Sequence, residues 1–192
     1  MNKLLLVISL LIFITAPSVV WSQDCTADDG TEGVELWCEC YSIENTTSLN
    51  LSNSELTGEI PPEIGNLINL EYLSLSSNQL TGEIPPEIGN LINLTILNFW
   101  NNQLSGDLPL EIGNLTNLTE LSLGNNDNLS GQIPAEIGNL TNLWKLWLYD
   151  NQFSGEIISE ICDLPNLRYL ALWGNNLEGE IPSCIGNLTN LE

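Results

Sequence analysis

Aliphatic residues recur at fixed offsets along most of the chain. In the segment that begins at Leu73 they occupy seven offsets, and most of the residues between them are polar. These offsets stay aliphatic or aromatic in every copy of the pattern, and the copies begin at Leu49, Leu73, Leu97, Leu121, Leu146 and Leu170. A fixed period of about 24 residues predicts stacked supersecondary units whose apolar side chains share one continuous core.

Each copy predicts a short strand followed by a return segment without a long helix. Leu73 and Leu75 alternate with polar residues, as in a strand with one buried face. Gly82, Pro85 and Pro86 exclude a long helix after it, so the chain is expected to return in extended or 3₁₀ pieces. An asparagine follows the strand in five copies, and we expect its buried amide to bond the loop backbone of its own and the next coil; these residues are Asn78, Asn102, Asn126, Asn151 and Asn175.

The pattern L-x-x-L-x-L-x-x-N-x-L-x-G-x-I-P-x-x-I-G-N-L-x-N-L resembles the plant-type extracellular leucine-rich repeat. The resemblance covers residues 49–192, which we read as six repeats that stop without a C-terminal cap, as in a truncated fragment. It implies an α/β solenoid, a curved horseshoe with a parallel sheet on its concave face and short 3₁₀ or extended segments on its convex face. It also implies a second, shorter strand at the G-x-I-P segment. Domains of this family bind proteins, peptides or glycans and are not enzymes.

Two segments precede the repeats. Residues 1–22 are predicted to be a signal peptide, because Lys3 is followed by an apolar run and then by Val20, Trp21 and Ser22, a small-residue cleavage pattern. Residues 23–48 do not fit the repeat, and we expect them to form a cysteine-containing N-terminal cap over the first coil. The resemblance implies that Trp37 packs on this coil and that Cys40 pairs with Cys25, which leaves Cys38 without a partner.

Cys162 and Cys184 lie in successive copies, on the return side of the coil. Their offsets differ by two positions, so stacking of the coils brings them close to the separation that a disulfide requires. We predict a Cys162–Cys184 disulfide in an exported protein, where oxidising conditions prevail. The alternative is two separate free thiols.

The composition narrows the possible partners and chemistry. The formal charge is −22, with 25 acidic residues against three basic ones, which argues against nucleic acid and anionic membrane surfaces. Histidine is absent, which rules out a Ser-His-Asp triad and histidine metal sites. Rows of Glu on the return side are interpreted as a solvated face, with weak Ca²⁺ binding as the alternative. No catalytic residue, metal site or cofactor is predicted.

The candidate binding surface consists of aromatic residues at the outward strand offsets. Exposed rings bordered by polar groups are typical of binding sites, and the alternative is that they only stabilise the sheet. Gly124 is expected to leave a gap between two of the rings, and the extra residue of the copy from Leu121 is expected to bulge the loop near it. The predicted ligand-binding residues are Trp100, Trp147, Tyr149, Tyr169, Trp173, Asp150 and Asn125.

These observations predict a secreted or cell-surface, non-catalytic binding module. Trp and Tyr beside Asn and Asp suit peptides and sugar rings equally, so the ligand is expected to be a protein, a peptide or a glycan. One alternative is the ectodomain of a membrane receptor or receptor-like kinase whose C-terminal part is missing. Another is a structural or adhesive surface protein. No transmembrane segment is expected in the mature chain.

Overall fold

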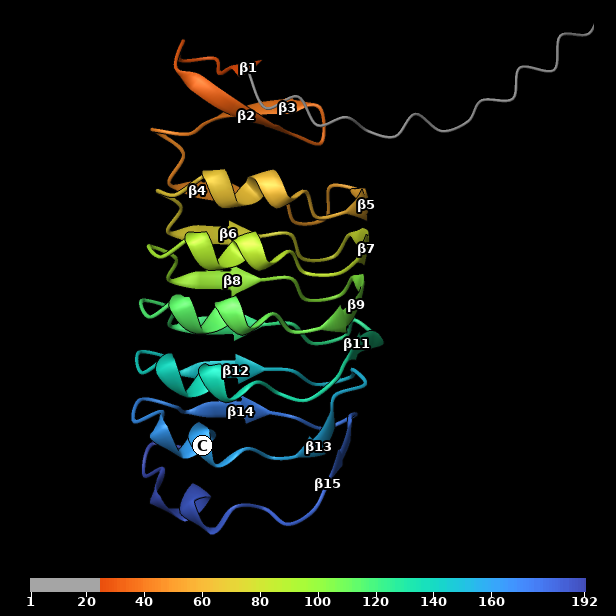
Figure 1. The fold of residues 1–192 in the computed structure, drawn as a ribbon, viewed down its shortest axis with the longest axis vertical. Coiled ribbons are helices and arrows are strands. Elements are labelled where there is room, and N and C mark those ends of the chain that lie inside the picture. Colours follow the sequence, from red (N-terminus) through yellow and green to blue (C-terminus); the bar gives the residue numbers. More distant parts are fainter. Residues whose placement is uncertain (1–24) are drawn as a thin grey trace, which may run out of the picture.

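The computed structural model describes residues 25–192, which form one stack of coils with a small amino-terminal sheet at one end (Figure 1). The predicted signal peptide, residues 1–22, lies outside the described residues. Each coil contributes one strand to a six-stranded parallel sheet, and equivalent leucines of successive copies pair, as Leu73 does with Leu97. The strands are β4 (Ser48–Asn50), β6 (Tyr72–Ser74), β8 (Ile96–Asn98), β10 (Glu120–Ser122), β12 (Lys145–Trp147) and β14 (Tyr169–Ala171).

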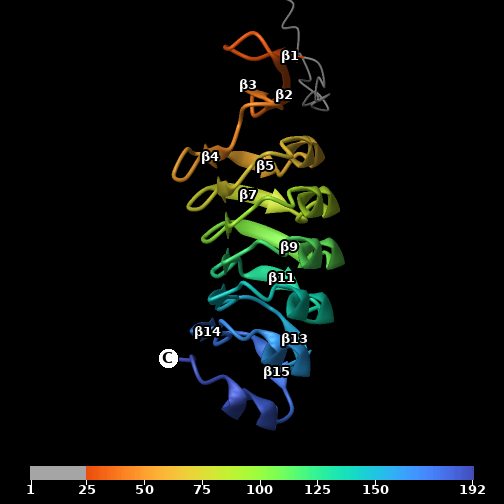
Figure 2. The ribbon, with the colours of Figure 1, turned by 90° about the vertical axis from the view of Figure 1, so that its left-hand side faces the viewer.

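The predicted solenoid with a parallel sheet is confirmed. We call the surface formed by the side chains that point out of the six-stranded sheet the concave face. The return side carries second strands, β5 (Thr57–Glu59), β7 (Gln79–Gly82), β9 (Gln103–Asp107) and β11 (Asn128–Ser130), with β13 (Ser154–Glu156) and β15 (Asn176–Glu178) pairing separately. It also carries six 3₁₀ helices stacked in a column (Figure 2): η1 (Pro62–Asn66), η2 (Pro86–Asn90), η3 (Leu110–Asn114), η4 (Ala135–Asn139), η5 (Ser159–Asp163) and η6 (Ser183–Asn187).

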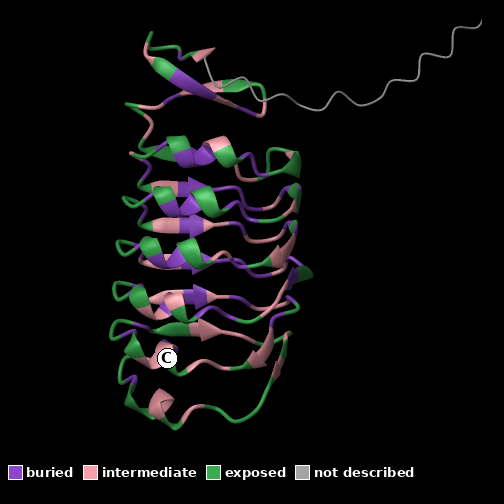
Figure 3. Ribbon diagram, viewed as in Figure 1, coloured by how far each residue is buried: buried purple, intermediate pink, exposed green. Residues whose placement is uncertain are grey.

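The core runs through the stack from the amino-terminal sheet to the last coil (Figure 3). The rings of Phe99 and Phe153 are fully buried among the leucines, as their offsets predict. The coils approach closely where glycine leaves room: a Cβ on Gly65 would lie 2.5 Å from the Glu87 carbonyl oxygen. Ile181, in the last coil, is 73% exposed, because a coil packs against only one side of it.

The asparagine that follows each strand bonds its own and the preceding coil, so the expected direction toward the next coil is wrong. Asn78 Nδ2 donates to the Leu75 and Leu51 carbonyls, at 2.8 Å each, and Asn78 Oδ1 accepts from the Leu56 N–H at 3.0 Å. The Leu51 N–H donates to a carbonyl of the following coil, so the backbone groups of this turn that lack a partner in their own coil point toward the following coil. The asparagine side chain that bonds them therefore belongs to the following coil.

The amino-terminal sheet is antiparallel and contains β1 (Cys25–Thr26), β2 (Glu32–Leu36) and β3 (Glu39–Ser42). Val34 and Leu36 are fully buried and extend the core of the repeats, and Trp37 packs against it. A disulfide joins Cys25 to Cys40, with the Cα atoms 6.1 Å apart, and Cys38 is free and exposed. Within residues 25–192, no helix is long and apolar enough to cross a membrane.

The structure also contains the second predicted disulfide. Cys162 on η5 is bonded to Cys184 on η6, and their Cα atoms are 5.9 Å apart. The bond joins the fifth coil to the sixth on the return side. It therefore ties the last coil covalently to the stack, where the noncovalent core is less complete.

Candidate functional site

Three aromatic rings form a continuous cluster at the carboxyl edge of the concave sheet. Tyr149 contacts Trp147 edge to face, with ring centroids 6.1 Å apart, and stacks on Trp173, with centroids 4.5 Å apart. Trp173 is 61% exposed, whereas Trp147 and Tyr149 are half-buried. We call Trp147, Tyr149 and Trp173 the aromatic cluster. An exposed indole supported by two further rings is a rigid, largely apolar platform.

Gly124 does not leave the expected gap on this face. A Cβ on Gly124 would lie 2.8 Å from Tyr149 Cε1, so the phenol ring of Tyr149 fills the space above the glycine. Gly124 itself is buried. The missing side chain thus makes room for a ring from the next coil.

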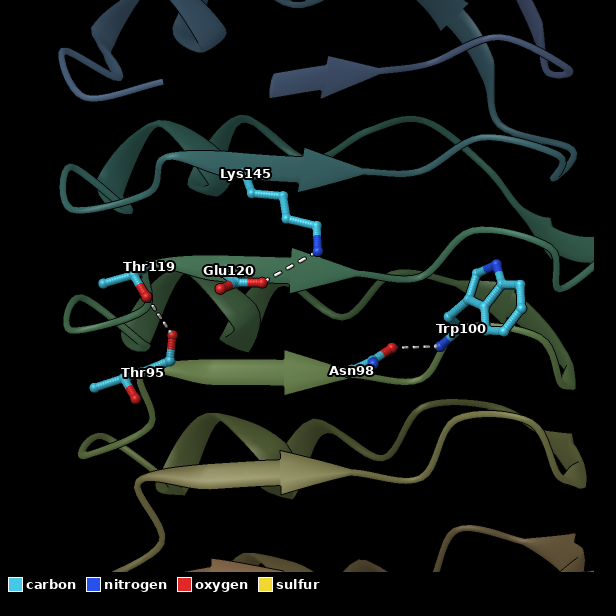
Figure 4. Close-up of polar contacts among 6 residues, drawn as sticks. All are labelled: Thr95, Asn98, Trp100, Thr119, Glu120 and Lys145. Atoms are coloured by element: carbon cyan, nitrogen blue, oxygen red, sulfur yellow. Dashed lines mark hydrogen bonds and ion pairs between the residues drawn. The ribbon is translucent and has the colours of Figure 1, made fainter. Parts of the chain in front are cut away.

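Lys145 joins the cluster to a carboxylate. Its Nζ lies 3.6 Å from the centroid of a Trp147 ring and 3.1 Å from Glu120 Oε2. Figure 4 shows the lysine reaching from β12 to Glu120 on β10. The ammonium group is therefore held between an indole face and a carboxylate, an arrangement in which both neighbours attract the cation.

Trp100, one of the predicted site residues, lies outside the cluster. It follows β8, where its backbone N–H donates to Asn98 Oδ1 at 3.1 Å (Figure 4). Its side chain is half-buried, and its indole Nε1 is buried without a hydrogen-bond partner among the described residues. A buried donor without an acceptor is costly, so this N–H destabilises the local structure rather than contributing to the aromatic cluster.

Tyr169, another predicted site residue, belongs to a separate aromatic pair at the opposite, amino edge of the sheet. Its ring lies edge to face with Trp144, with centroids 5.7 Å apart. Its hydroxyl donates to Glu192 Oε2 at 2.8 Å, and this hydrogen bond raises the pKa of Tyr169. Trp144 was not among the residues predicted from the sequence. Its offset is held by Thr95 and Thr119 in two earlier copies, and an indole at such a position is the same signal that identified the other rings.

Asn125 and Asp150 belong to a row of residues with positive φ that turns the chain after each strand. The positive φ explains why Asn, Asp and Gly are common at this offset, because these residues tolerate the left-handed region. Asn125 donates through Nδ2 to Asn101 Oδ1 of the preceding coil. The Asp150 carboxylate lies against the backbone of Gly174, the neighbour of Trp173. The row consists of Asn53, Ser77, Asn101, Asn125, Asp150 and Gly174.

The extra residue of the fourth copy disturbs a second row, the buried asparagines that bond neighbouring coils, beside the aromatic cluster. We call this set the asparagine row; it consists of Asn78, Asn102, Asn126, Asn151 and Asn175. Asp127 has a positive φ of 53°, and the Gln152 side chain donates to its carbonyl oxygen. The buried Oδ1 of Asn151 has no partner, whereas Asn126 Oδ1 accepts from the Leu104 N–H at 3.2 Å. The insertion thus removes one inter-coil hydrogen bond next to the site.

The charged groups of this face are mostly acidic. The two basic side chains of residues 25–192 are both paired, Lys145 with Glu120 and Arg168 with Glu192 at 3.2 Å. In the described part of the chain, no group of three or more His, Cys, Asp or Glu residues is placed to hold a metal ion. The geometry therefore provides an aromatic platform with carboxylates at its edge.

Comparison with known proteins adds an independent result. A sequence model described as leucine-rich repeat region matches residues 48–192. A comparison with curated proteins finds no match.

Several solved structures are similar to the chain. The ectodomain of the Arabidopsis thaliana receptor kinase GASSHO1/SCHENGEN3, in complex with CASPARIAN STRIP INTEGRITY FACTOR 2, is 42% identical with a TM-score of 0.75, over 77% of this chain and 18% of that one. The Arabidopsis receptor kinase HAESA, in complex with the peptide hormone IDA and the co-receptor SERK1, is 43% identical with a TM-score of 0.72, over 74% of this chain and 24% of that one.

The ectodomain of the Arabidopsis thaliana receptor kinase SOBIR1 has a length similar to that of the present chain. It is 32% identical with a TM-score of 0.64, and the match covers 86% of each chain. The chain therefore spans 18% and 24% of the first two ectodomains but most of the third.

Proposed function

Because the chain belongs to the leucine-rich repeat family of the plant type, we propose that it is a non-catalytic binding module that recognises a peptide or protein on its concave face. The observation that carries the proposal is the aromatic cluster, in which Trp173 is 61% exposed on the solvent side of a rigid sheet. Large exposed rings on a fixed scaffold supply much of the free energy in protein recognition. GASSHO1/SCHENGEN3 was solved in complex with CASPARIAN STRIP INTEGRITY FACTOR 2 and HAESA in complex with the peptide hormone IDA, and these complexes support a peptide or protein ligand for this chain as well.

The proposed location is extracellular or on the cell surface. Two disulfides join cysteines of the described residues, and such bonds persist in oxidising compartments. The high negative charge keeps the module soluble and discourages binding to anionic surfaces. A glycan is the second candidate ligand, because the open face of Trp173 suits a sugar ring as well as a side chain.

The test of this function uses the secreted protein with a random-peptide phage library and a glycan array as probes. Trp173→Ala and Trp147→Ala should each weaken binding of the selected probes by at least about tenfold, the size expected for central aromatic contacts. Trp144→Ala is the matched control, because it removes an indole outside the aromatic cluster. Probes that bind all three variants as well as the parent protein would contradict the proposal.

A receptor ectodomain is a second candidate, and the similarity to receptor-kinase ectodomains favours it. An antibody against the repeats should then detect a membrane-bound species much larger than 21.2 kDa in the native cells. A single secreted species close to that mass would support the free binding module.

A further inference from the structure

We propose that the ligand of the concave face is a cationic peptide, and that one of its Arg or Lys side chains lies on Trp173 beside Asp150. This inference rests on the proposed function, since it names the class of ligand for the same surface. It starts from an arrangement that the chain itself contains. Lys145 Nζ lies 3.6 Å from the centroid of a Trp147 ring and 3.1 Å from a Glu120 oxygen, so a cation already occupies the space between an indole and a carboxylate.

Trp173 and Asp150 offer an indole and a carboxylate on neighbouring coils, and neither is paired with a cation among the described residues. One face of the indole rests on Tyr149, and 61% of the residue is exposed. The Asp150 N–H donates to the Trp173 carbonyl at 2.9 Å, and the Asp150 carboxylate lies against the adjacent Gly174. Because Asp150 and Trp173 lie on neighbouring coils joined by this backbone hydrogen bond, a long Arg or Lys side chain on the indole is within reach of this carboxylate, and each contact favours the cation.

Neither basic side chain in residues 25–192 is available to bind beside Trp173 and Asp150. Lys145 is held by Glu120 and Trp147, and Arg168 is held by Glu192 on the other edge of the sheet. The exposed Asp127 lies in the same turn region, where its N–H donates to the Asp150 carbonyl at 3.4 Å. The aromatic platform therefore has carboxylates on its border and no unpaired cation among the described residues.

The charge of the whole chain acts in the same direction. A formal charge of −22 attracts cationic ligands during encounter and repels anionic ones. An anionic ligand group would also lack a free basic side chain to pair with on the described concave face. The local and the long-range electrostatics thus select the same class of ligand.

The direct test compares two capped pentapeptides, Gly-Arg-Gly-Arg-Gly and its analogue with citrulline in place of arginine. Citrulline has nearly the shape of arginine but no charge. The arginine peptide should shift the indole N–H resonance of Trp173 and bind at least about tenfold more tightly than the citrulline peptide, with an affinity that falls as salt increases. Equal binding of the two peptides would overturn the inference.

A pair of variants separates the local site from the overall charge. Asp150→Asn should weaken binding of the arginine peptide about three- to tenfold. The fold should tolerate this substitution, because Asn stands at the same offset in three other coils. Glu87→Gln on η2 removes the same charge from the opposite side and should change the affinity less than about twofold. Equal effects of the two substitutions would contradict a site at Asp150.

The phage library distinguishes a failure of this inference from a failure of the proposed function. Selected peptides that require Trp173 and are enriched in Arg and Lys support both. Selected peptides that require Trp173 but show no such enrichment leave the binding function intact and overturn the cationic ligand. A selection without any peptide that depends on Trp173 overturns both.

Discussion

The indole of Trp173 stacks on the phenol ring of Tyr149, with the ring planes 14° from parallel and the centroids 4.5 Å apart. Tyr149 can lie in this position because its ring covers Gly124, a residue of the preceding coil. Three successive coils therefore determine the shape of the aromatic cluster. A residue without a side chain is as important to the surface as the rings themselves.

The first prediction is that Gly124→Ala disrupts the aromatic cluster with little loss of stability. The new Cβ would lie 2.8 Å from Tyr149 Cε1, and the ring can swing outward to relieve the contact. We expect a weaker near-ultraviolet circular dichroism band from the stacked rings and a stability loss of about 1 kcal/mol or less. Gly186→Ala is the control, because nothing lies within 4 Å of the added Cβ. An unchanged band in Gly124→Ala would show that the ring does not depend on the glycine.

The second prediction compares Asn126 and Asn151, two members of the asparagine row. Asn126→Ala removes two donated hydrogen bonds, to the Leu123 and Phe99 carbonyls, and leaves the buried Leu104 N–H without its acceptor. Asn151 donates to three carbonyls, but its Oδ1 has no partner, so Asn151→Ala leaves no N–H unpaired. Asn126→Ala should therefore cost about 1 kcal/mol more than Asn151→Ala in urea unfolding. Equal losses would mean that Asn126 Oδ1 contributes nothing.

The third prediction concerns Asp29 in the turn between β1 and β2. Hydrogen bonds from the Thr31 side chain, then from Asn45 and the Thr31 N–H, lower the pKa of Asp29 from 3.8 to about 2. The ionised carboxylate therefore stabilises the folded state above pH 4, and this contribution is lost as the pH falls toward 2.

The measurement is the difference in unfolding free energy between the parent protein and Asp29→Asn. This difference should be positive at pH 6 and should shrink between pH 4 and pH 2. Using the difference cancels the titration of the other carboxyl groups. A difference that stays constant over this range would contradict the assigned pKa.

The fourth prediction concerns the cysteines. Alkylation of the native protein without reduction, followed by mass spectrometry, should label Cys38 alone among the cysteines, because the other four are paired. Replacing both Cys162 and Cys184 by Ser should lower the stability by about 3 kcal/mol in the chain-entropy model for a loop of this length. Labelling of Cys162 and Cys184 in the native protein would refute the bridge between the last two coils.

The repeat architecture could be predicted because each offset has one structural role. Leu73 and Leu97 occupy equivalent offsets, and they pair in the sheet as the period requires. The pairing of Cys162 with Cys184 follows from the same geometry, since the period places both on neighbouring coils. Contacts that are determined by the repeat period alone can thus be predicted from the sequence.

The arrangement of the site was less predictable, because it depends on side-chain directions. The glycine at 124 shows only that a side chain is missing, and the structure is needed to show that Tyr149 fills the space. The division of the predicted rings into a cluster, an isolated Trp100 and a Tyr169–Trp144 pair also depends on the direction of each ring. Offsets identify the face on which a ring lies but not its neighbours.

The hydrogen bonds of the asparagine row imply an order in which the coils become structured. Asn78 completes the hydrogen bonds of Leu51, Leu56 and Ser54, which all precede it in the chain. During synthesis, these backbone groups of one coil therefore lack their hydrogen-bond partners until the following coil has left the ribosome. Ordering of the repeats should accordingly advance from the amino end and remain one coil behind translation.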